Sequence, residues 1–353
     1  LIITNYIIIK MNEFKIGNHH IGVNSAPFII AEAGINHDGN YEKAIQLVDS
    51  AKESGADCVK FQYHITDAEL IKSDIKPGYL SKEKLWDITK HIELTTDEHI
   101  GIKKYCEQVG INYMSTPFSR EAADILNSME VDVFKIGSGE CNNIPLLEHI
   151  SKMSRPIILS TGMNDIDSIR QSVEVIQKYD CPLMLMHCTS IYPTPYDKVR
   201  LGVIKQLQDT FQLPVGLSDH SENIYTSLAA VSLGACVIEK HFTVSSKWPG
   251  PDISFSIEPK ELADLVKGSK AIFAALGGNK SVLPEETPVK DFAFASVVAI
   301  KSIKVGETLN EDNIWVKKPG TGEIEAKNLN IVLGKTAKVD ISADQQLSYD
   351  MFN

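Results

Sequence analysis

The stretch PIILSTGMNDIDSIRQSVEVIQKYDCPLMLMH, residues 156–187, contains the unit from which the fold of the chain follows. A short apolar run at residues 156–160 precedes an amphipathic pattern over 165–178, and a second apolar run follows at 182–187. Short, continuous apolar runs are typical of strands that are buried on both faces, as in a parallel sheet. The stretch therefore predicts a strand, a helix and a second strand parallel to the first.

The same unit recurs on both sides of this stretch. The other apolar runs lie at residues 27–33, 57–62, 111–115, 133–136, 214–217 and 236–240. Helical patterns follow the runs, at residues 41–54, 82–91, 96–109, 120–127, 145–152, 200–208, 223–233 and 259–276. Eight strand-then-helix units in roughly 250 residues predict a (β/α)₈ TIM barrel.

The composition changes after the eighth unit. Residues 277–290, GGNKSVLPEETPVK, combine glycine, proline and charge, which is typical of a linker. From Asp291 on, the runs FAFASVVAI, KVGETL, IWVKKPG and GKTAKVDI predict short strands with turns. We therefore expect a barrel domain over residues 11–280, a linker over 281–294 and a small β-rich domain over 295–353.

The bulk composition argues against several classes of protein. Of the 353 residues, 43% are hydrophobic and 23% charged, which is ordinary for a globular protein. The formal net charge of -11, without a Lys/Arg tract, argues against nucleic acid or a membrane as a partner. Six scattered cysteines without a CxxC pair indicate reduced thiols and a cytoplasmic protein. The apolar residues 1–10 are too few for a membrane span, and we expect Met11 to be the natural start.

Polar side chains stand where each predicted strand ends. In a TIM barrel these carboxyl ends face the active site. The residues are Glu32, Asn36, His37, Lys60, Gln62, His64, Ser115, Thr116, Lys135, Ser138, Glu140, Ser160, Thr161, His187, Ser190, Tyr192, Ser218, Asp219, His220, Glu239, Lys240 and His241. A barrel without catalytic function has no reason to carry them at all eight ends, so the pattern predicts an active site.

His220 and His241 end neighbouring predicted strands, so their imidazoles can converge. Two imidazoles with oxygen ligands suit a divalent ion such as Mn²⁺, with Mg²⁺ as an alternative. A pair of hydrogen-bonded rim histidines explains the same spacing equally well. Asp219 could orient one of the histidines from behind.

Lys60 and Lys135, with Ser138, Ser160 and Ser218, form a plausible cradle for phosphate and carboxylate groups. For any single serine a helix N-cap is the more frequent explanation, so the prediction depends on the whole set. Either lysine as a Schiff-base nucleophile is a less favoured alternative.

Glu32, Glu140 and Asp252 are candidates for proton transfer or for binding substrate hydroxyls. Carboxylates in a cationic pocket are as often only salt-bridge partners, and the residue types alone do not decide between these roles.

Ordered motifs along the chain resemble the bacterial N-acetylneuraminate (sialic acid) synthases. They are AEAGINHDG (31–39), KFQ (60–62), STPFSR (115–120), KIGSGECNN (135–143), STGM (160–163), HCTSIYPTPY (187–196), GLSDH (216–220), EKHFT (239–243) and GPD (250–252). DFAFASVVAIKSIKVGE (291–307) and NIWVKKPGTG (313–322) are similar to that family's antifreeze-protein-like (SAF) domain. The resemblance extends from about Phe14 to the end of the chain.

The resemblance implies N-acetylneuraminate synthase activity, in which phosphoenolpyruvate, N-acetylmannosamine and water give N-acetylneuraminate and phosphate by C–O cleavage. It implies a divalent metal, Mn²⁺ with Mg²⁺ or Co²⁺ as alternatives, on His220 and His241. It implies catalytic roles for Glu32, Glu140 and Lys60, with Glu140 handling a proton. The phosphoenolpyruvate contacts that it implies are Lys60, Thr116, Lys135, Ser138, Ser160, Ser190 and Ser218. The amino-sugar contacts are Gln62, Tyr192 and Asp252.

The resemblance also implies a domain-swapped homodimer, in which the small domain of one chain caps the barrel of the other. Three positions depart from the family pattern. Ser190 stands where Asn is frequent, and Lys318 stands where Arg usually reaches the N-acyl group of the sugar. Lysine lacks the planar fork of arginine, so acyl recognition is expected to differ. Residues 75–85, IKPGYLSKEKL, lack the Asn that follows PG in relatives.

Three other functions compete with this one. A legionaminate synthase that uses a diacetamido-trideoxy sugar fits AEAGINHDG and KFQ at least as well, whereas DFAFASVV and ECNNIPLL favour neuraminate. A Schiff-base aldolase would use Lys60 or Lys135. A sugar- or ice-binding protein would act through the small domain, but the polar barrel mouth argues against it.

Overall fold

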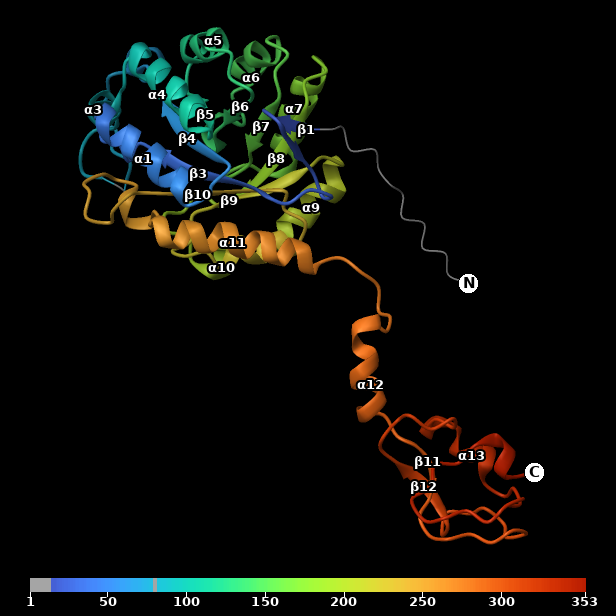
Figure 1. Ribbon diagram of the computed structural model, residues 1–353. Coiled ribbons are helices and arrows are strands. Elements are labelled where there is room, and N and C mark those ends of the chain that lie inside the picture. The colour runs from blue at the N-terminus through green and yellow to red at the C-terminus, as the bar shows by residue number, and fades with distance from the viewer. Residues whose placement is uncertain (1–13, 79–80) are drawn as a thin grey trace. The chain divides into compact units, whose positions relative to one another are not determined.

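The computed structural model describes residues 14–78 and 81–353 (Figure 1). The chain divides into two compact units, one up to Gly277 and one from Gly278. The segment 1–10 and the expected start at Met11 lie outside the described residues.

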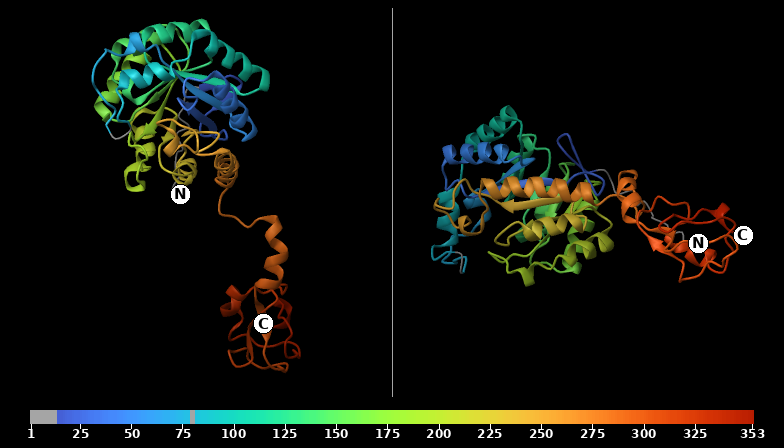
Figure 2. Two further views of the ribbon diagram at one scale, coloured as in Figure 1. Left: turned by 90° about the vertical axis from the view of Figure 1, so that its left-hand side faces the viewer. Right: turned by 60° about the horizontal axis from the view of Figure 1, so that its bottom comes forward.

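The first unit is built around a sheet of eight parallel strands. In the order in which they pair, the strands are β5 (Asn112–Pro117), β4 (Cys58–Tyr63), β3 (Phe28–Gly34), β10 (Val237–His241), β9 (Val215–Asp219), β8 (Leu183–Cys188), β7 (Ile157–Ser160) and β6 (Phe134–Ile136). The two strands at the ends of this order lie against each other and close the sheet. Helices surround it on the outside (Figures 1 and 2), and the predicted (β/α)₈ barrel is confirmed.

The helices follow the strands as the apolar patterns predict, to within a few residues. Those on the outside of the barrel are α1 (Tyr41–Glu53), α4 (Thr96–Val109), α5 (Arg120–Ser128), α6 (Ile144–Ser151), α7 (Ile166–Gln177), α9 (Gly202–Phe211), α10 (Tyr225–Ser232) and α11 (Pro259–Ala275). Shorter helices stand in the segments that follow β4 and β8, and they are α2 (Thr66–Glu69), α3 (Leu85–Ile92) and α8 (Tyr196–Val199).

Side-chain caps fix where several of these helices begin. Asn40 accepts a hydrogen bond from the backbone of Lys43 at the start of α1, and Asp165 accepts one from Ser168 at the start of α7. Thr95 forms a capping box with Glu98 at the start of α4. Because such caps satisfy backbone N–H groups that have no partner within the helix, the chain turns from strand to helix at defined residues.

A hairpin that the sequence patterns did not predict closes the amino-terminal end of the barrel. Its strands β1 (Phe14–Ile16) and β2 (His19–Ile21) pair in antiparallel fashion. Their apolar side chains join a buried cluster inside the barrel that includes Phe28 and Cys58, which begin β3 and β4. The barrel therefore has a closed apolar floor and opens at the carboxyl ends of its strands.

The second unit holds a small β structure with a core of its own. Strands β11 (Ser296–Ala299) and β12 (Ile314–Lys317) pair in antiparallel fashion, and Val297, Ile314 and Ile341 are among the buried core residues. The runs KVGETL and GKTAKVDI, predicted as strands, form only isolated bridges.

The segment expected as a linker is partly helical. It contains a 3₁₀ turn at Pro284–Glu286 and helix α12 (Thr287–Ala293). Asp291, expected to begin the β-rich pattern, is therefore helical, and the first strand begins five residues later at Ser296. Pro288 stands in the first turn of α12, where a missing N–H costs nothing, so proline here begins a helix rather than preventing one.

Two expectations from composition can be compared with the described part of the chain. All six cysteines are buried free thiols, as expected for a protein without a disulfide framework. Within residues 14–78 and 81–353, the helices are all too short or too polar to span a bilayer.

Candidate active site

A cavity of about 430 Å³ opens at the carboxyl ends of the barrel strands. Its lining comes from residues far apart in the sequence, because neighbouring parallel strands end at the same edge of the sheet. The lining residues are Glu32, Lys60, Gln62, Pro77, Thr116, Phe118, Lys135, Gly137, Ser138, Gly139, Ser160, Met163, Cys188, Ser190, Tyr192, Ser218, His220, Glu239 and His241. Most of the site residues expected from the sequence are in this set.

Two lysines and two glutamates form the charged centre of the cavity. Nζ of Lys60 lies 2.7 Å from Oε2 of Glu32 and 3.8 Å from Oε2 of Glu239, and Nζ of Lys135 lies 3.4 Å from Oε1 of Glu239. All four side chains are buried. Burial lowers the pKa of Lys135, whereas for Lys60 the effect of burial is outweighed by Glu239 and Glu32, which raise its pKa.

Each lysine also donates to a hydroxyl group. Nζ of Lys60 lies 3.2 Å from Oγ1 of Thr116, and Nζ of Lys135 lies 2.8 Å from Oγ of Ser160. The ammonium groups are thus held on strands β4 and β6 with their remaining N–H groups available to an anion.

Two further serines are fixed by neighbours within the site. Ser218 donates to Oε1 of Glu239 over 3.0 Å, and Oγ of Ser138 accepts from the backbone N–H of Gly162 over 3.0 Å. Ser160 and Ser218 lie within strands, and the helices that follow these strands start from other residues. The alternative explanation as helix N-caps therefore fails for both.

Glu239 is the site residue to which sequence reasoning assigned no role. It stands in β10 between Ile238, which packs in the core, and Lys240, which points away from the cavity. Because side chains alternate along a strand, Glu239 and His241 share the inner face of the barrel. The alternation of inward and outward side chains in Glu239–His241 is the pattern that predicts its place in the site.

His220 and His241 lie side by side at the ends of β9 and β10, with ring centroids 5.3 Å apart. Nδ1 of His220 is 3.1 Å from the carbonyl oxygen of Thr189, a contact that leaves Nε2 for another partner. Nδ1 of His241 is buried without a hydrogen bond, 3.6 Å from Oδ2 of Asp252. The ring of Tyr192 packs 4.2 Å from that of His220.

This pair fits a divalent metal only in part. Burial lowers the pKa of His241 well below its usual range, so its imidazole is neutral and has a lone pair to offer. Burial, together with Glu32, raises the pKa of Asp252 to about 7. In the part of the chain that the structure describes, no group of three or more His, Cys, Asp or Glu side chains forms a complete metal site. The remaining ligands would have to come from water or substrate.

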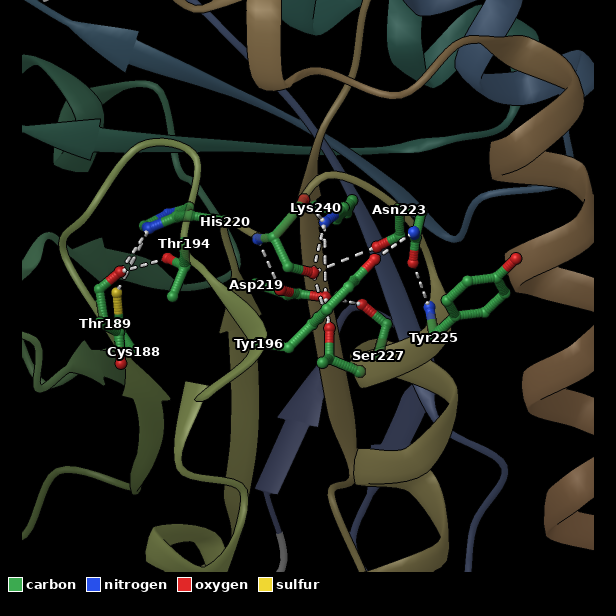
Figure 3. A network of polar contacts seen from close by, with 12 residues as sticks. Cys188, Thr189, Thr194, Tyr196, Asp219, His220, Asn223, Tyr225, Ser227 and Lys240 are labelled. Carbon is green, nitrogen blue, oxygen red and sulfur yellow. Dashed lines mark hydrogen bonds and ion pairs between the residues drawn. The ribbon is translucent and has the colours of Figure 1, made fainter. Parts of the chain in front are cut away.

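A buried ion pair between Asp219 and Lys240 connects the ends of β9 and β10, and Figure 3 shows it together with His220. Nζ of Lys240 lies 3.4 Å from Oδ2 of Asp219 and donates to the backbone carbonyl of Ser221. Asp219 also accepts from Thr226 over 2.7 Å and from Ser227 over 2.6 Å, both on α10. Each histidine directly follows one member of this pair in the sequence, so the network holds β9, β10 and α10 in register beside the site.

Of the residues with an expected catalytic, binding or metal role, three lie outside the cavity lining. The other strand-end residues outside it are Asn36, His37, His64, Ser115, Thr161, His187, Asp219 and Lys240. Glu140, half-buried in the turn Ser138–Glu140, accepts from Nδ2 of Asn143 over 2.5 Å, and burial raises its pKa. Asp252 stands beside His241 on the segment after β10. Lys318 belongs to the second unit, where it lines a pocket with neighbours in sequence and space.

The fold and the cavity define a TIM-barrel enzyme with a buried site of paired lysines and glutamates, joined to a small β-rich unit. The chain belongs to the NeuB family, whose model matches residues 47–281, and the SAF domain model matches residues 294–353. The resemblance drawn from the motifs is thereby confirmed.

Similar proteins come from distant organisms. An uncharacterized protein of Methanocaldococcus jannaschii is 41% identical, over 96% of this chain and 98% of its own. An N,N'-diacetyllegionaminic acid synthase of Legionella pneumophila is 37% identical, over 92% of this chain and 94% of its own. The solved structure of an N-acetylneuraminic acid synthetase from Leptospira borgpetersenii, in complex with citrate, has a TM-score of 0.72 at 33% identity and covers 79% of this chain and 95% of that one. Other relatives are named pseudaminic acid synthases, so the chain is an enzyme of the sugar-acid synthase type.

Proposed function

We propose that this enzyme condenses phosphoenolpyruvate with an N-acylated amino sugar and water to give a nine-carbon sugar acid and phosphate. The observation that carries the proposal is the pair of buried lysines, Lys60 and Lys135, held among hydroxyl groups on the floor of one cavity. Two ammonium groups with oriented hydroxyls match the carboxylate and phosphate of a small substrate with two anionic groups.

Two amino sugars are candidates for the second substrate. N-acetylmannosamine, which would give N-acetylneuraminate, is our first candidate because the motifs at 140–147 and 291–298 resemble the neuraminate enzymes. A 2,4-diacetamido-2,4,6-trideoxy sugar, which would give N,N'-diacetyllegionaminate, is the second. Higher identity to the legionaminic acid synthases, 37% and 39%, than to the human N-acetylneuraminate-9-phosphate synthase, 34%, favours the second candidate.

The reaction forms one C–C bond and one C–O bond to water, and it breaks one C–O bond. C3 of phosphoenolpyruvate attacks the aldehyde carbon of the open-chain sugar, and the aldehyde oxygen takes up a proton. Water adds to C2 and gives up a proton. The C2 hydroxyl then passes its proton to the phosphate, which leaves with the bridging oxygen as the C2 carbonyl forms. Lys60 and Lys135 neutralise the anionic groups throughout and hold both substrates in register, which lowers the entropic barrier.

Glu32 is the carboxylate best placed for these proton movements. It lines the cavity, and burial raises its pKa although Lys60 opposes this effect. A carboxyl group with a raised pKa can carry a proton at neutral pH and return it within one cycle. Glu140 remains a second candidate from the family resemblance. His220 and His241 would hold a divalent ion, Mn²⁺ first with Mg²⁺ or Co²⁺ as alternatives, which when bound supplies a Lewis acid for the sugar carbonyl.

Product analysis tests the proposal directly. Phosphoenolpyruvate labelled with ¹⁸O at the bridging oxygen is incubated with each amino sugar, and products are identified by mass spectrometry. We expect a sugar acid free of label and labelled phosphate. Lys135→Met should lose at least a hundredfold in kcat/KM, while Lys178→Met, an exposed lysine at the end of α7, serves as the control. Label retained in the sugar acid, or no product from either sugar, would contradict the proposal.

We further propose that the enzyme acts as a domain-swapped homodimer and that Lys318 contacts the N-acyl group of the sugar. The support is the family resemblance of residues 313–322 and the small size of the SAF unit. Lys318→Ala should raise KM for the amino sugar by about tenfold, since a charged hydrogen bond is lost, and leave KM for phosphoenolpyruvate nearly unchanged. Steady-state kinetics with each substrate varied in turn provide the measurement, and unchanged constants for both would contradict the assignment.

A further inference from the structure

A chain of hydrogen bonds leads from a short helix beside the barrel mouth into the cavity. Glu69, the last residue of α2, lies with Oε1 2.8 Å from Nδ1 of His64, and Nε2 of His64 lies 3.0 Å from Oε1 of Gln62. Gln62 in turn donates through Nε2 to Oε1 of Glu32 over 3.3 Å. Gln62 and Glu32 line the cavity, whereas His64 and Glu69 stand behind them. The two outer residues therefore reach the cavity through the hydrogen bonds to Gln62 and through the stacking of His64 on Phe118, which also lines the cavity.

The His64 ring is held on its face as well as at both nitrogens. It stacks on Phe118, with ring centroids 4.5 Å apart and planes 11° apart. The side chains of His64 and Glu69 are only 10% and 6% exposed. Burying a carboxylate costs free energy unless it has a partner. Because Glu69 has little access to solvent, its contact with His64 is favoured. The imidazole consequently has one orientation.

Each hydrogen bond from Glu69 to Glu32 determines which atom donates in the next one. The carboxylate of Glu69 only accepts, so Nδ1 of His64 carries a hydrogen. Nε2 of His64 lies against the carbonyl oxygen of Gln62, and the amide nitrogen of Gln62 faces Glu32. If the amide turned over, its carbonyl oxygen would face Oε1 of Glu32. While Glu32 is ion-paired with Lys60, at 2.7 Å from its other oxygen, these two acceptors would repel.

One donor remains after these contacts are made. The amide of Gln62 has two N–H groups, and Glu32 occupies one of them. The side chain borders the cavity, so the other N–H is available to a ligand there. A fixed donor selects a ligand oxygen, whereas an amide free to turn over would offer a donor in one orientation and an acceptor in the other.

We propose that His64 and Glu69 are positioning residues that hold the Gln62 amide as a donor toward an oxygen atom of the amino sugar. The inference rests on the proposed function and extends it to two residues that do not touch the substrate. Selectivity for a sugar oxygen beside Gln62 then depends on the direction of the hydrogen bonds that run from Glu69 through His64 to Gln62.

Sugar binding measured without turnover tests the inference. His64→Phe keeps an aromatic face against Phe118 and removes both hydrogen bonds. We expect its Kd for the amino sugar, measured by titration calorimetry, to rise about tenfold while the Kd for phosphoenolpyruvate stays within about twofold. His149→Phe is the matched control, because His149 also pairs with a carboxylate, Asp124, over 2.7 Å, but on the outside of the barrel. An unchanged sugar Kd in His64→Phe would overturn the proposal.

A double-mutant cycle separates positioning from a general structural effect. Gln62→Ala removes the donor itself, so adding His64→Phe should weaken sugar binding no further. Equal losses from His64→Phe in both backgrounds would show that His64 does not act through Gln62. If His64→Phe does not fold, Glu69→Gln replaces it in the same cycle. We expect Glu69→Gln to weaken sugar binding only when Gln62 is present. Sugar binding without turnover would overturn the proposed reaction alone, whereas absence of binding to either sugar would overturn both proposals.

Discussion

At the scale of single residues, Gly162 affects how much room the cavity leaves for a ligand. Gly162, on the segment after β7, donates its N–H to Ser138, and its missing side chain faces the hydroxyls of Ser138 and Ser190. A Cβ at this position would collide with Oγ of Ser190, lie 2.8 Å from Oγ of Ser138 and 3.2 Å from Sγ of Cys188. The glycine is therefore needed for close approach, and its backbone φ is not the reason.

Gly162→Ala should disturb phosphoenolpyruvate more than the sugar. Because the added methyl group displaces two hydroxyls assigned to phosphoenolpyruvate, we expect KM for this substrate to rise by roughly an order of magnitude, with kcat less affected. Gly202→Ala, where a Cβ meets nothing within 4 Å, is the control. Initial-rate measurements with phosphoenolpyruvate varied at saturating sugar provide the readout, and equal kinetics for the two variants would contradict the expectation.

Two buried histidines away from the cavity should make the barrel less stable in acid. Burial lowers the pKa of His37 to about 4 and that of His99 to about 3. In the unfolded chain a histidine binds a proton near pH 6.5. Below that pH the unfolded state therefore binds more protons than the folded state, and the free energy of unfolding falls as the pH is lowered toward about 4. Each histidine contributes up to about 1.4 kcal/mol per pH unit.

His99→Phe should reduce this acid sensitivity. Phenylalanine can keep the stacking against Tyr63, whose ring centroid lies 4.1 Å from that of His99, but it cannot bind a proton. Between pH 6 and 5 we expect the free energy of unfolding of the variant to fall by about 1 kcal/mol less than that of the unaltered protein. Urea unfolding of the barrel at the two pH values gives the comparison. The prediction fails if His99→Phe and the control His149→Phe show the same pH dependence.

At the scale of the elements, the register of β9, β10 and α10 depends on a buried charge pair. Asp219 and Lys240 are fully buried, and the aspartate accepts three hydrogen bonds besides the ion pair. These contacts hold its pKa low, with Lys240 the strongest of the favourable influences against burial. Removing one partner of such a pair leaves a buried charge without compensation.

Asp219→Ala should lower the free energy of unfolding by about 3–5 kcal/mol. The double variant Asp219→Ala, Lys240→Met should be more stable than the single one, because it removes the uncompensated ammonium group as well. Asp209→Ala breaks an exposed pair with Lys205 on α9 and should cost at most about 1 kcal/mol. Chemical unfolding of all three variants provides the values. A double variant less stable than Asp219→Ala would show that the hydroxyl contacts, rather than the charge pair, dominate.

At the scale of the whole molecule, the sequence predicts the barrel because eight apolar runs alternate with helical patterns. It also predicts that strand-end residues such as Lys60 and Lys135 meet, since parallel strands end at one edge. The hairpin at Phe14–Ile21 escapes prediction because its strands of three residues show no periodicity. The contact between His64 and Glu69 escapes it too, because it depends on how a single turn of helix is placed after β4.

The division into two units predicts that the barrel folds without the SAF unit. Both core clusters of the barrel lie within residues 14–277, and the core of the second unit lies within 297–352. A fragment that ends at Gly277 should therefore unfold cooperatively, with a urea midpoint close to that of the barrel transition in the full chain. It should be inactive if Lys318 and the dimer act as proposed. A fragment without cooperative unfolding would show that the barrel needs the second unit for stability.

The hairpin β1–β2 has a consequence for the order of events in a catalytic cycle. Its residues Phe14, Ile16 and Ile21 fill the amino-terminal end of the barrel, where His19 also packs edge-on against Phe28 at 5.1 Å. Within the described residues, that end of the barrel offers reactants and products no passage. If both substrates and both products pass through the open end, the ligand nearest the floor arrives first and departs last, because the outer product blocks its exit. The hairpin therefore predicts an ordered kinetic mechanism, because it fills the end of the barrel opposite the active site. Such a mechanism would show competitive inhibition by only one of the two products.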